Sequence, residues 1–202
     1  MNHKYFVMLF SFLVCLGGYA QPSARVMLDD FTTITSWQNM GGTENPEENI
    51  YWSRCGSFKD VSRSDGYCAK LSFDVIFREA EFGVGNNRVY IQKLDKNAEG
   101  IRLQVNPCGF NTRFTADLRL SDGQLIRTVY VPASGDGWRE IFIPFPKEKI
   151  AGRHPFSVYR LVVWFSGPAK GEIFFDDVAV DFKKLPKDLA PLTAEPVYRK
   201  LG

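Results

Sequence analysis

The chain has 202 residues, of which 25 are Lys or Arg, 23 are Asp or Glu, 45% are hydrophobic and 14% are aromatic. This length suits one domain of ordinary size, which can bury a substantial core. The composition excludes collagen, a coiled coil and an acidic disordered chain. A formal charge of +2 gives no uniform field that would hold nucleic acid or an anionic membrane surface.

The first 20 residues have the three-part pattern of a secretory signal peptide. They begin with the basic Lys4, continue with an apolar run up to Leu16, and end with small residues before a cleavage site expected after Ala20. The alternative, a membrane anchor, is disfavoured because the apolar run is shorter than the roughly 20 residues that span a bilayer. We therefore expect a secreted, periplasmic or cell-surface protein without membrane insertion.

Three cysteines remain after removal of residues 1–20, an odd number for an oxidising compartment. Cys55 and Cys68 flank a polar loop, so a disulfide that closes a local hairpin is the preferred pairing. The alternative is that these two residues and Cys108 are unpaired thiols. A zinc site is disfavoured, because no pair of cysteines has metal-ligand spacing and His154 is the only histidine left.

Alternation of apolar and polar residues with a period of two dominates the rest of the chain. A hairpin turn is predicted at 121–124, and a short helix is expected only around 146–151. Over 125–131, Ile126, Thr128 and Tyr130 alternate with Leu125, Arg127, Val129 and Val131. Strands are predicted over 69–77, 101–105, 114–120, 125–131, 138–145, 159–165 and 171–182.

Many short strands separated by turns are typical of an antiparallel β-sandwich or barrel. We therefore predict an all-β domain over residues 24–183. Beyond it, residues 184–202 contain three prolines and no sustained alternation, which indicates an exposed tail or a linker. A linker here would make this chain the front portion of a larger protein.

Three stretches together resemble the galactose-binding-like jelly rolls, which include many carbohydrate-binding modules and the complex I intermediate-associated protein family. They are VMLDDF at 26–31, followed by Trp37; the polar hairpin and Gly-Trp-x-x-hydrophobic-x-Pro-Phe segment at 118–145; and GEIFFDDVAV at 171–180. Their order and spacing cover nearly the whole predicted domain. The resemblance implies a β-sandwich of jelly-roll topology, although a fold does not fix a function.

The resemblance also implies a structural calcium ion between the first and last strands. It would place Asp30, Asp176 or Asp177 near that ion, with backbone carbonyls from the 64–66 loop. Calcium accepts such a mixture of carboxylate and carbonyl oxygens. The alternative is that these aspartates only bracket strand ends and cap loops.

Glycan-binding proteins stack a sugar ring on an aromatic side chain and surround it with hydrogen-bonding groups. Trp138 and Trp37 are assigned to packing. Trp164 lies on the opposite face of its strand from Leu161, Val163 and Phe165, and Trp52 lies in a polar segment. Trp52 and Trp164 are therefore the predicted stacking platforms, with simple packing between sheets as the alternative for both.

Polar partners for a sugar are expected in two loops, from Asn87 and Arg88 in one and from Arg113 in the other. An arginine can hold a carboxylate or sulfate through two parallel hydrogen bonds, which would suit an acidic polysaccharide. Ordinary solvated loop residues are the alternative. The Gly-rich GVGNNR stretch is not a phosphate loop, because no Gly-Lys-Ser/Thr follows it.

The leading prediction is a non-catalytic module that holds a poly- or oligosaccharide, near a glycan-processing enzyme or the cell surface. One alternative is a polysaccharide hydrolase or lyase of the same fold. It is disfavoured because Glu172, Asp176 and Asp177 of the last predicted strand lack the spacing of a glycosidase pair, and no Gly-x-Ser-x-Gly elbow is present. The other alternative is a protein-docking domain, which the complex I relatives suggest.

Overall fold

Most of the described part of the chain is β-strand. A computed structural model describes residues 24–29, 31, 37–42, 56–59, 67–75, 78–86 and 94–184, with the backbone alone for 37–42, 56–59, 67 and 86. Its elements are β1 (Ala24–Asp29), β2 (Trp37–Gly42), β3 (Gly56–Lys59), β4 (Tyr67–Val75), β5 (Glu79–Asn86), β6 (Ala98–Asn106), β7 (Thr112–Arg119), β8 (Leu125–Arg127), β9 (Val131–Ala133), β10 (Arg139–Pro144), α1 (Lys147–Ile150), β11 (Ser157–Ser166) and β12 (Ala169–Phe182).

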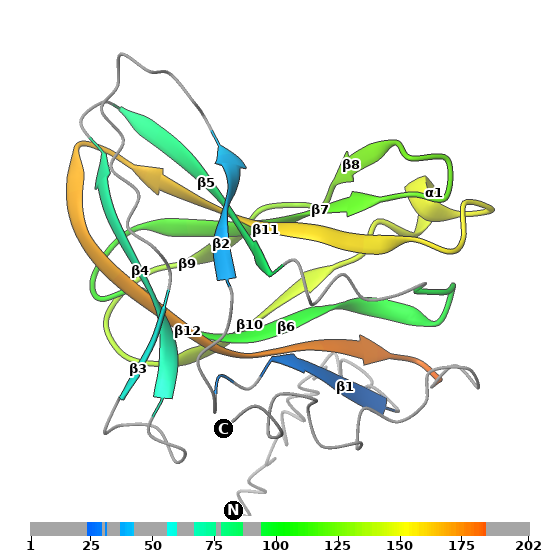
Figure 1. Ribbon diagram of the computed structural model, residues 1–202, viewed down its shortest axis with the longest axis horizontal. Helices are drawn as coiled ribbons and strands as arrows, with labels where there is room; N and C mark the ends of the chain where they lie inside the picture. The colour runs from blue at the N-terminus through cyan, green and yellow to red at the C-terminus, as the bar shows by residue number, and fades with distance from the viewer. Residues whose placement is uncertain are drawn as a thin grey trace, which may run out of the picture.

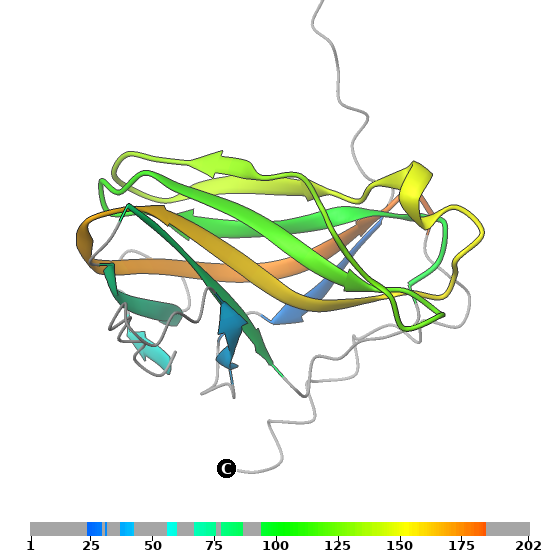
Figure 2. The same cartoon turned by 90° about the horizontal axis from the view of Figure 1, so that it is seen from above.

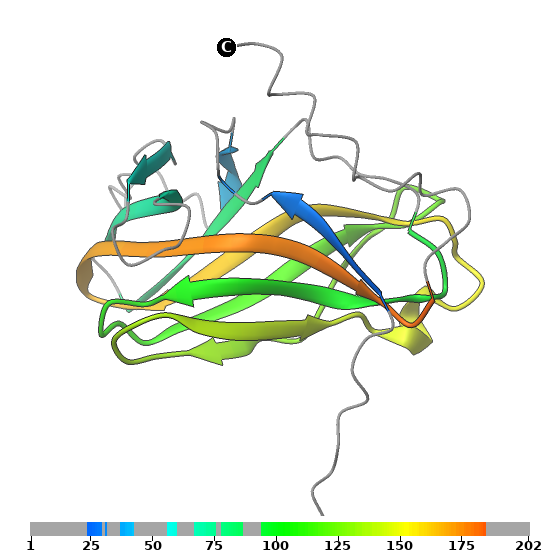
Figure 3. The same cartoon turned by 90° about the horizontal axis from the view of Figure 1, so that it is seen from below.

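These strands form two antiparallel sheets that pack face to face (Figure 1). The first sheet has the order β10-β6-β12-β4-β3, with β1 also paired to β12. The second has the order β2-β5-β11-β7-β8, with β9 also paired to β7. Figure 2 looks onto the second sheet, and Figure 3 looks onto the first. The predicted all-β sandwich of jelly-roll type is confirmed.

The core lies between the two sheets, where the apolar side of each alternating strand faces inward. Leu161, Val163 and Phe165 of β11 are buried there. The ring of Phe165 stacks on Phe73 of β4 with 3.9 Å between centroids, which joins the two layers directly. It also meets Phe82 of β5 edge-on at 5.6 Å. Burial of these rings supplies the dispersion contacts and apolar area that hold the layers together.

The alternation predicted over 125–131 is wrong for its second half. Instead of one strand, the structure has β8 and β9, which pair with different parts of β7. Arg127 lies opposite Asp117 and Val131 lies opposite Phe114, so three residues of this segment face two of β7. This is a β-bulge, and one extra residue shifts every later side chain to the other face. Arg127 and Tyr130 therefore share a face, which strict alternation would not allow.

Two smaller predictions agree with the structure. The hairpin turn at 121–124 is closed by hydrogen bonds between the backbones of Leu120 and Gln124 and of Gly123 and Leu120. The short helix expected around 146–151 is α1. Over the residues that the structure describes, no helix has the length and apolar character needed to cross a bilayer.

Gly100 of β6 is a position where only glycine fits. A Cβ atom there would lie 2.5 Å from the backbone oxygen of Ile143 and 2.6 Å from the ring of Phe142. The backbone of the paired strand β10 cannot move away without breaking its ladder of hydrogen bonds. We expect Gly100→Ala to lower the free energy of unfolding by about 2 kcal/mol, measured by urea unfolding. Ser166→Ala, at an exposed strand end, is the control. Equal urea midpoints of unfolding for the two variants would contradict the close packing of Gly100 against β10.

Candidate functional site

Polar and aromatic side chains gather on the outer face of the second sheet. There β5, β7 and β11 turn away from the core the side chains that alternate with the buried ones. We call this surface the polar sheet face. It comprises Glu79, Glu81, Arg113, Thr115, Asp117, Arg119, Arg127, Tyr130, Tyr159, Arg160 and Trp164.

Asp117 is the centre of this face, because its carboxylate holds two arginines. It is only 5% exposed. The Nε of Arg127 donates to its Oδ1 at 2.7 Å, and the Nε of Arg160 donates to its Oδ2 at 2.7 Å. Burial alone would raise the pKa of Asp117, but the hydrogen bonds and positive charges of the two arginines lower it below its usual range. The carboxylate is therefore ionised at neutral pH.

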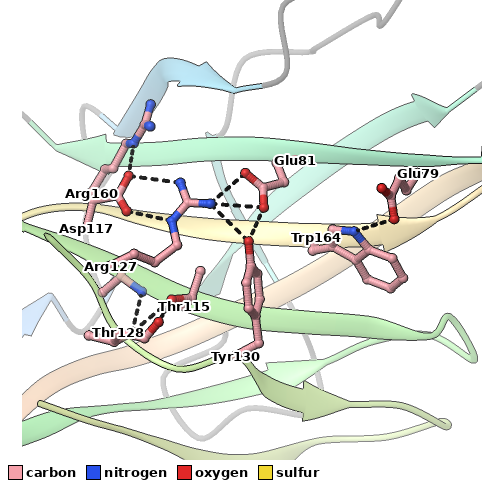
Figure 4. A network of polar contacts seen from close by, with 10 residues as sticks. Glu79, Glu81, Thr115, Asp117, Arg127, Thr128, Tyr130, Arg160 and Trp164 are labelled. Atoms are coloured by element: carbon pink, nitrogen blue, oxygen red, sulfur yellow. Dashed lines mark hydrogen bonds and ion pairs between the residues drawn. The ribbon is translucent and has the colours of Figure 1, made fainter. Parts of the chain in front are cut away.

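Arg127 links Asp117 to a second acid and to a tyrosine (Figure 4). Its Nη1 donates to both carboxylate oxygens of Glu81, at 2.8 and 3.0 Å, and to the Tyr130 hydroxyl at 2.9 Å. The Tyr130 hydroxyl in turn donates to Glu81. Partial burial and the bond to Glu81 raise the pKa of Tyr130, although Arg127 opposes this. Four side chains from three strands and the β8–β9 bulge are thus joined in one network.

Two buried threonines fix the bulge that brings Tyr130 to this network. The hydroxyls of Thr115 and Thr128 lie 2.8 Å apart. The Thr128 hydroxyl also accepts the backbone N–H of Ala116 at 2.9 Å. A buried donor or acceptor left without a partner is costly, so these bonds hold the irregular backbone in one conformation.

Trp164 lies at one end of the polar sheet face and is half-buried. Its register neighbours are Arg113 on β7 and Glu81 on β5. The Arg113 guanidinium lies 4.5 Å from the centre of the indole ring, within cation–π range. The indole Nε1 donates to Glu79 at 3.2 Å (Figure 4). Neighbours on the same sheet therefore hold the indole ring in its orientation: Arg113 contacts its face and Glu79 accepts the hydrogen bond from its Nε1.

A second stack of the same kind lies at the other end of β7. The Arg119 guanidinium is 4.5 Å from the centre of the Tyr159 ring, and the Arg160 guanidinium is 5.8 Å from it. Tyr159 is the extra residue of a bulge between Val158 and Arg160. The two stacks flank the Asp117 network from both sides.

The structure brings together two of the five residues predicted from the sequence to bind a ligand. Trp164 and Arg113 are in contact on the polar sheet face, and Trp164 does point away from the core, as its strand pattern predicted. Trp52, Asn87 and Arg88 lie outside the described residues, so their roles stay predictions.

Sequence reasoning missed the residues at the centre of the face. Asp117 and Arg119 alternate with the predicted core residues of their strand, so the pattern could have assigned them to the same face as Arg113. No sequence signal marks Tyr130, because its position depends on the bulge. The pairing of Arg127 with Glu81, 46 residues away, depends on the register of three strands and is not readable from local sequence.

The aspartates predicted to bind calcium lie near an irregularity of β12. Asp176 is fully buried, and its carboxylate accepts the backbone N–H of Asp177 at 2.8 Å. Asp177 has a φ of 51°, in the left-handed region, and the register shifts between Asp176 and Ala179. In the described ranges no three His, Cys, Asp or Glu residues are grouped closely enough to hold a metal ion. Asp30, the third predicted ligand, lies outside them.

The predicted disulfide between Cys55 and Cys68 stays a prediction as well. Cys68 is buried on β4 and lies opposite Phe58 of β3. Cys55, which directly precedes β3 in the sequence, lies outside the described residues.

Comparison with known proteins supports the fold at low sequence identity. The sequence matches no protein-family model, and no curated protein sequence is significantly similar to it. The family 11 carbohydrate-binding module of the cellulosomal cellulase Lic26A-Cel5E of Clostridium thermocellum superposes with a TM-score of 0.54 at 14% identity, over 79% of this chain and 95% of that module. A carbohydrate-binding module structure from work on promiscuous specificity in the β-sandwich superfamily has a TM-score of 0.51 at 10% identity, over 78% of this chain and 61% of that one.

The fold is therefore that of the β-sandwich jelly-roll carbohydrate-binding modules, and the resemblance noted in the sequence is confirmed at this level. Identities of 10% and 14% establish a shared architecture and nothing about the ligand.

The lowered pKa of Asp117 gives a test of the network. A carboxylate whose folded pKa is below its unfolded value of about 3.9 contributes stability above that pH and loses it as the pH falls through the folded pKa. We expect Asp117→Asn to lower the free energy of unfolding at pH 7 by about 2 kcal/mol, because two guanidinium groups lose an ionised acceptor. The difference from wild type should shrink as the pH falls below 4.

The measurement is urea unfolding between pH 2.5 and 7. Asp122→Asn, which removes an exposed carboxylate paired with Arg153, is the matched control and should cost much less at pH 7. A difference between wild type and Asp117→Asn that stays constant over this range would show that the charge of Asp117 does not stabilise the fold.

Proposed function

We propose that this chain is an exported carbohydrate-binding module that holds a glycan on the polar sheet face. The observation that carries the proposal is the half-buried indole of Trp164, which stands on the outside of a rigid sheet with Arg113 on its ring and Glu79 at its Nε1. An indole can bury the C–H face of a sugar, and the charged neighbours can bond its hydroxyls.

The Asp117 network supports binding because it is fixed before a ligand arrives. Arg127, Glu81 and Tyr130 already bond one another, so little side-chain entropy remains to be lost on association. A rigid set of donors and acceptors also discriminates between sugars, since a wrong epimer leaves some of them unpaired.

The pKa shifts of Asp117 and Tyr130 suit neither residue to general acid or base catalysis of glycan cleavage. A glycosidase general acid needs a carboxyl with a raised pKa, whereas the pKa of Asp117 is lowered. A lyase base needs an easily ionised group, whereas the pKa of Tyr130 is raised. In its proposed role the module would keep a glycan-processing enzyme or the cell surface close to its polysaccharide.

Trp164→Ala tests the proposed platform. Removal of the indole should weaken glycan binding by about 2 kcal/mol, roughly thirtyfold in Kd, because the sugar loses the apolar surface it buries. The measurement is affinity gel electrophoresis against a panel of neutral and acidic polysaccharides. Trp52→Ala belongs in the same panel, because Trp52 is the other predicted platform.

Phe142→Ala is the matched control, since Phe142 lies on the first sheet beneath the guanidinium of Arg102 at 4.8 Å. It should leave retention unchanged. Wild-type protein that no polysaccharide retains, or Trp164→Ala protein retained as strongly as wild type, would refute the proposed site. A stoichiometric protein partner captured without sugar dependence would favour the docking role instead.

We also propose a structural calcium ion at Asp30, Asp176 and Asp177. The pairing of β1 with β12 supports it, because Asp29 lies opposite Val178 and the end of β1 therefore lies beside the two aspartates of β12. Carboxylate chemistry suits calcium, which prefers hard oxygen ligands, and the ion would tie the end of β1 to β12.

A ligand that binds only the folded state raises its stability, by about 2.7 kcal/mol at a hundred times its Kd. We therefore expect EDTA to lower the melting temperature by several degrees, and added calcium, but not sodium, to restore it. Asp176→Asn protein should melt at the same temperature with or without calcium. A wild-type melting temperature indifferent to EDTA would eliminate the ion.

A further inference from the structure

Two exposed arginines at opposite ends of β7 point to the class of glycan. Building on the proposed function, we infer that the polar sheet face takes an acidic polysaccharide, whose carboxylate or sulfate groups are held by Arg113 and Arg119. Each of these guanidinium groups lies on an aromatic ring, Arg113 on Trp164 and Arg119 on Tyr159.

The stacked geometry suits the capture of an anion. A guanidinium that lies on a ring presents its N–H donors along its own edge, where an anion can accept two parallel hydrogen bonds. The ring restricts the side chain, so less entropy is lost when the anion binds. At the Trp164 end the sugar that carries the anion would use the part of the indole that Arg113 leaves uncovered.

The charged groups at the centre of the face are paired with one another, whereas the arginines at its two ends have no acid paired with them in the described part of the chain. Arg127 and Arg160 are paired with Asp117, and Arg127 also with Glu81. Arg113 and Arg119 are exposed, and neither forms an ion pair with any residue in the described ranges. Arg113 and Arg119 therefore have N–H donors to offer a ligand, while the centre offers a mixed set of donors and acceptors.

The acidic groups near the two stacks make them unequal. Glu79 accepts a bond from Trp164 and would oppose an anion at the Arg113 end. At the other end Arg160 adds a second guanidinium near the Tyr159 ring, and the nearby hairpin acid, Asp122, is paired with Arg153. We expect Arg119 to contribute more to anion binding than Arg113.

The spacing of the stacks selects a polymer. Arg113 and Arg119 are six residues apart on one face of a strand, which is about 20 Å. One sugar unit cannot reach both, whereas one chain can engage both and gain from the high effective concentration of its second anion. Affinity should therefore rise with chain length and fall with added salt, which screens exposed charges.

The test is isothermal titration of the full chain with polygalacturonate, which carries carboxylates, κ-carrageenan, which carries sulfates, and mixed-linkage β-glucan, which is neutral. We expect at least one acidic polymer to bind about tenfold more tightly than the neutral one. Arg119→Gln should remove most of this preference and Arg113→Gln part of it. Lys170→Gln, which removes one charge from a side chain 79% exposed on the first sheet, should change nothing.

The possible results distinguish a failure of the acidic-polysaccharide inference from a failure of the proposed carbohydrate binding. Preference for polygalacturonate alone or for carrageenan alone supports the inference and identifies the anionic group. Binding of β-glucan that depends on Trp164 but not on Arg119 would overturn it and leave carbohydrate binding intact. Binding of no polysaccharide at all would overturn both. Polyglutamate bound as tightly as polygalacturonate would replace the glycan with an acidic protein.

Discussion

Two ion pairs to the nearly buried carboxylate of Asp117 organise the polar sheet face. Asp117 can stay ionised at 5% exposure only because Arg127 and Arg160 donate to both of its oxygens. With its Nε held by Asp117, Arg127 presents its Nη1 to Glu81 and Tyr130. One ion-pair network thereby connects β5, β7, β8 and β11, and it sets the shape of the surface that we propose as the binding site.

Two β-bulges also determine which side chains lie on the polar sheet face. The β8–β9 bulge adds one residue opposite β7 and brings Tyr130 onto the face of Arg127. The bulge in β11 similarly adds Tyr159 beside Arg119. Regular strands would have placed small or apolar side chains at these points. The aromatic and hydroxyl groups on the face thus come from departures from the strand pattern, which is where a rigid sheet can acquire a function.

The regular part of the fold was predictable from sequence, and the site only in part. Period-two alternation predicts the strands around Phe114, Leu161 and Ile173, because one buried face imposes it. The same rule assigned Trp164 to the outside. It could not give the register that brings Glu81 to Arg127, since that pairing is decided by contacts between strands distant in sequence. It also could not locate Tyr130, because a bulge has no signature in a single sequence.

Comparison with the outer face of the first sheet shows why the outer face of the second sheet is the better candidate for the binding site. There Arg25 and Arg102 share Asp181 and Glu140. Burial would lower the pKa of Arg102, but its bonds to these acids raise it, as expected of a cation fully committed to internal partners. Arg102 also lies over Phe142, so an arginine–aromatic stack alone does not distinguish the two faces. What distinguishes the second face, over the described residues, is that two of its stacked arginines have no acid paired with them. Their N–H donors are therefore free to bind an anion from outside.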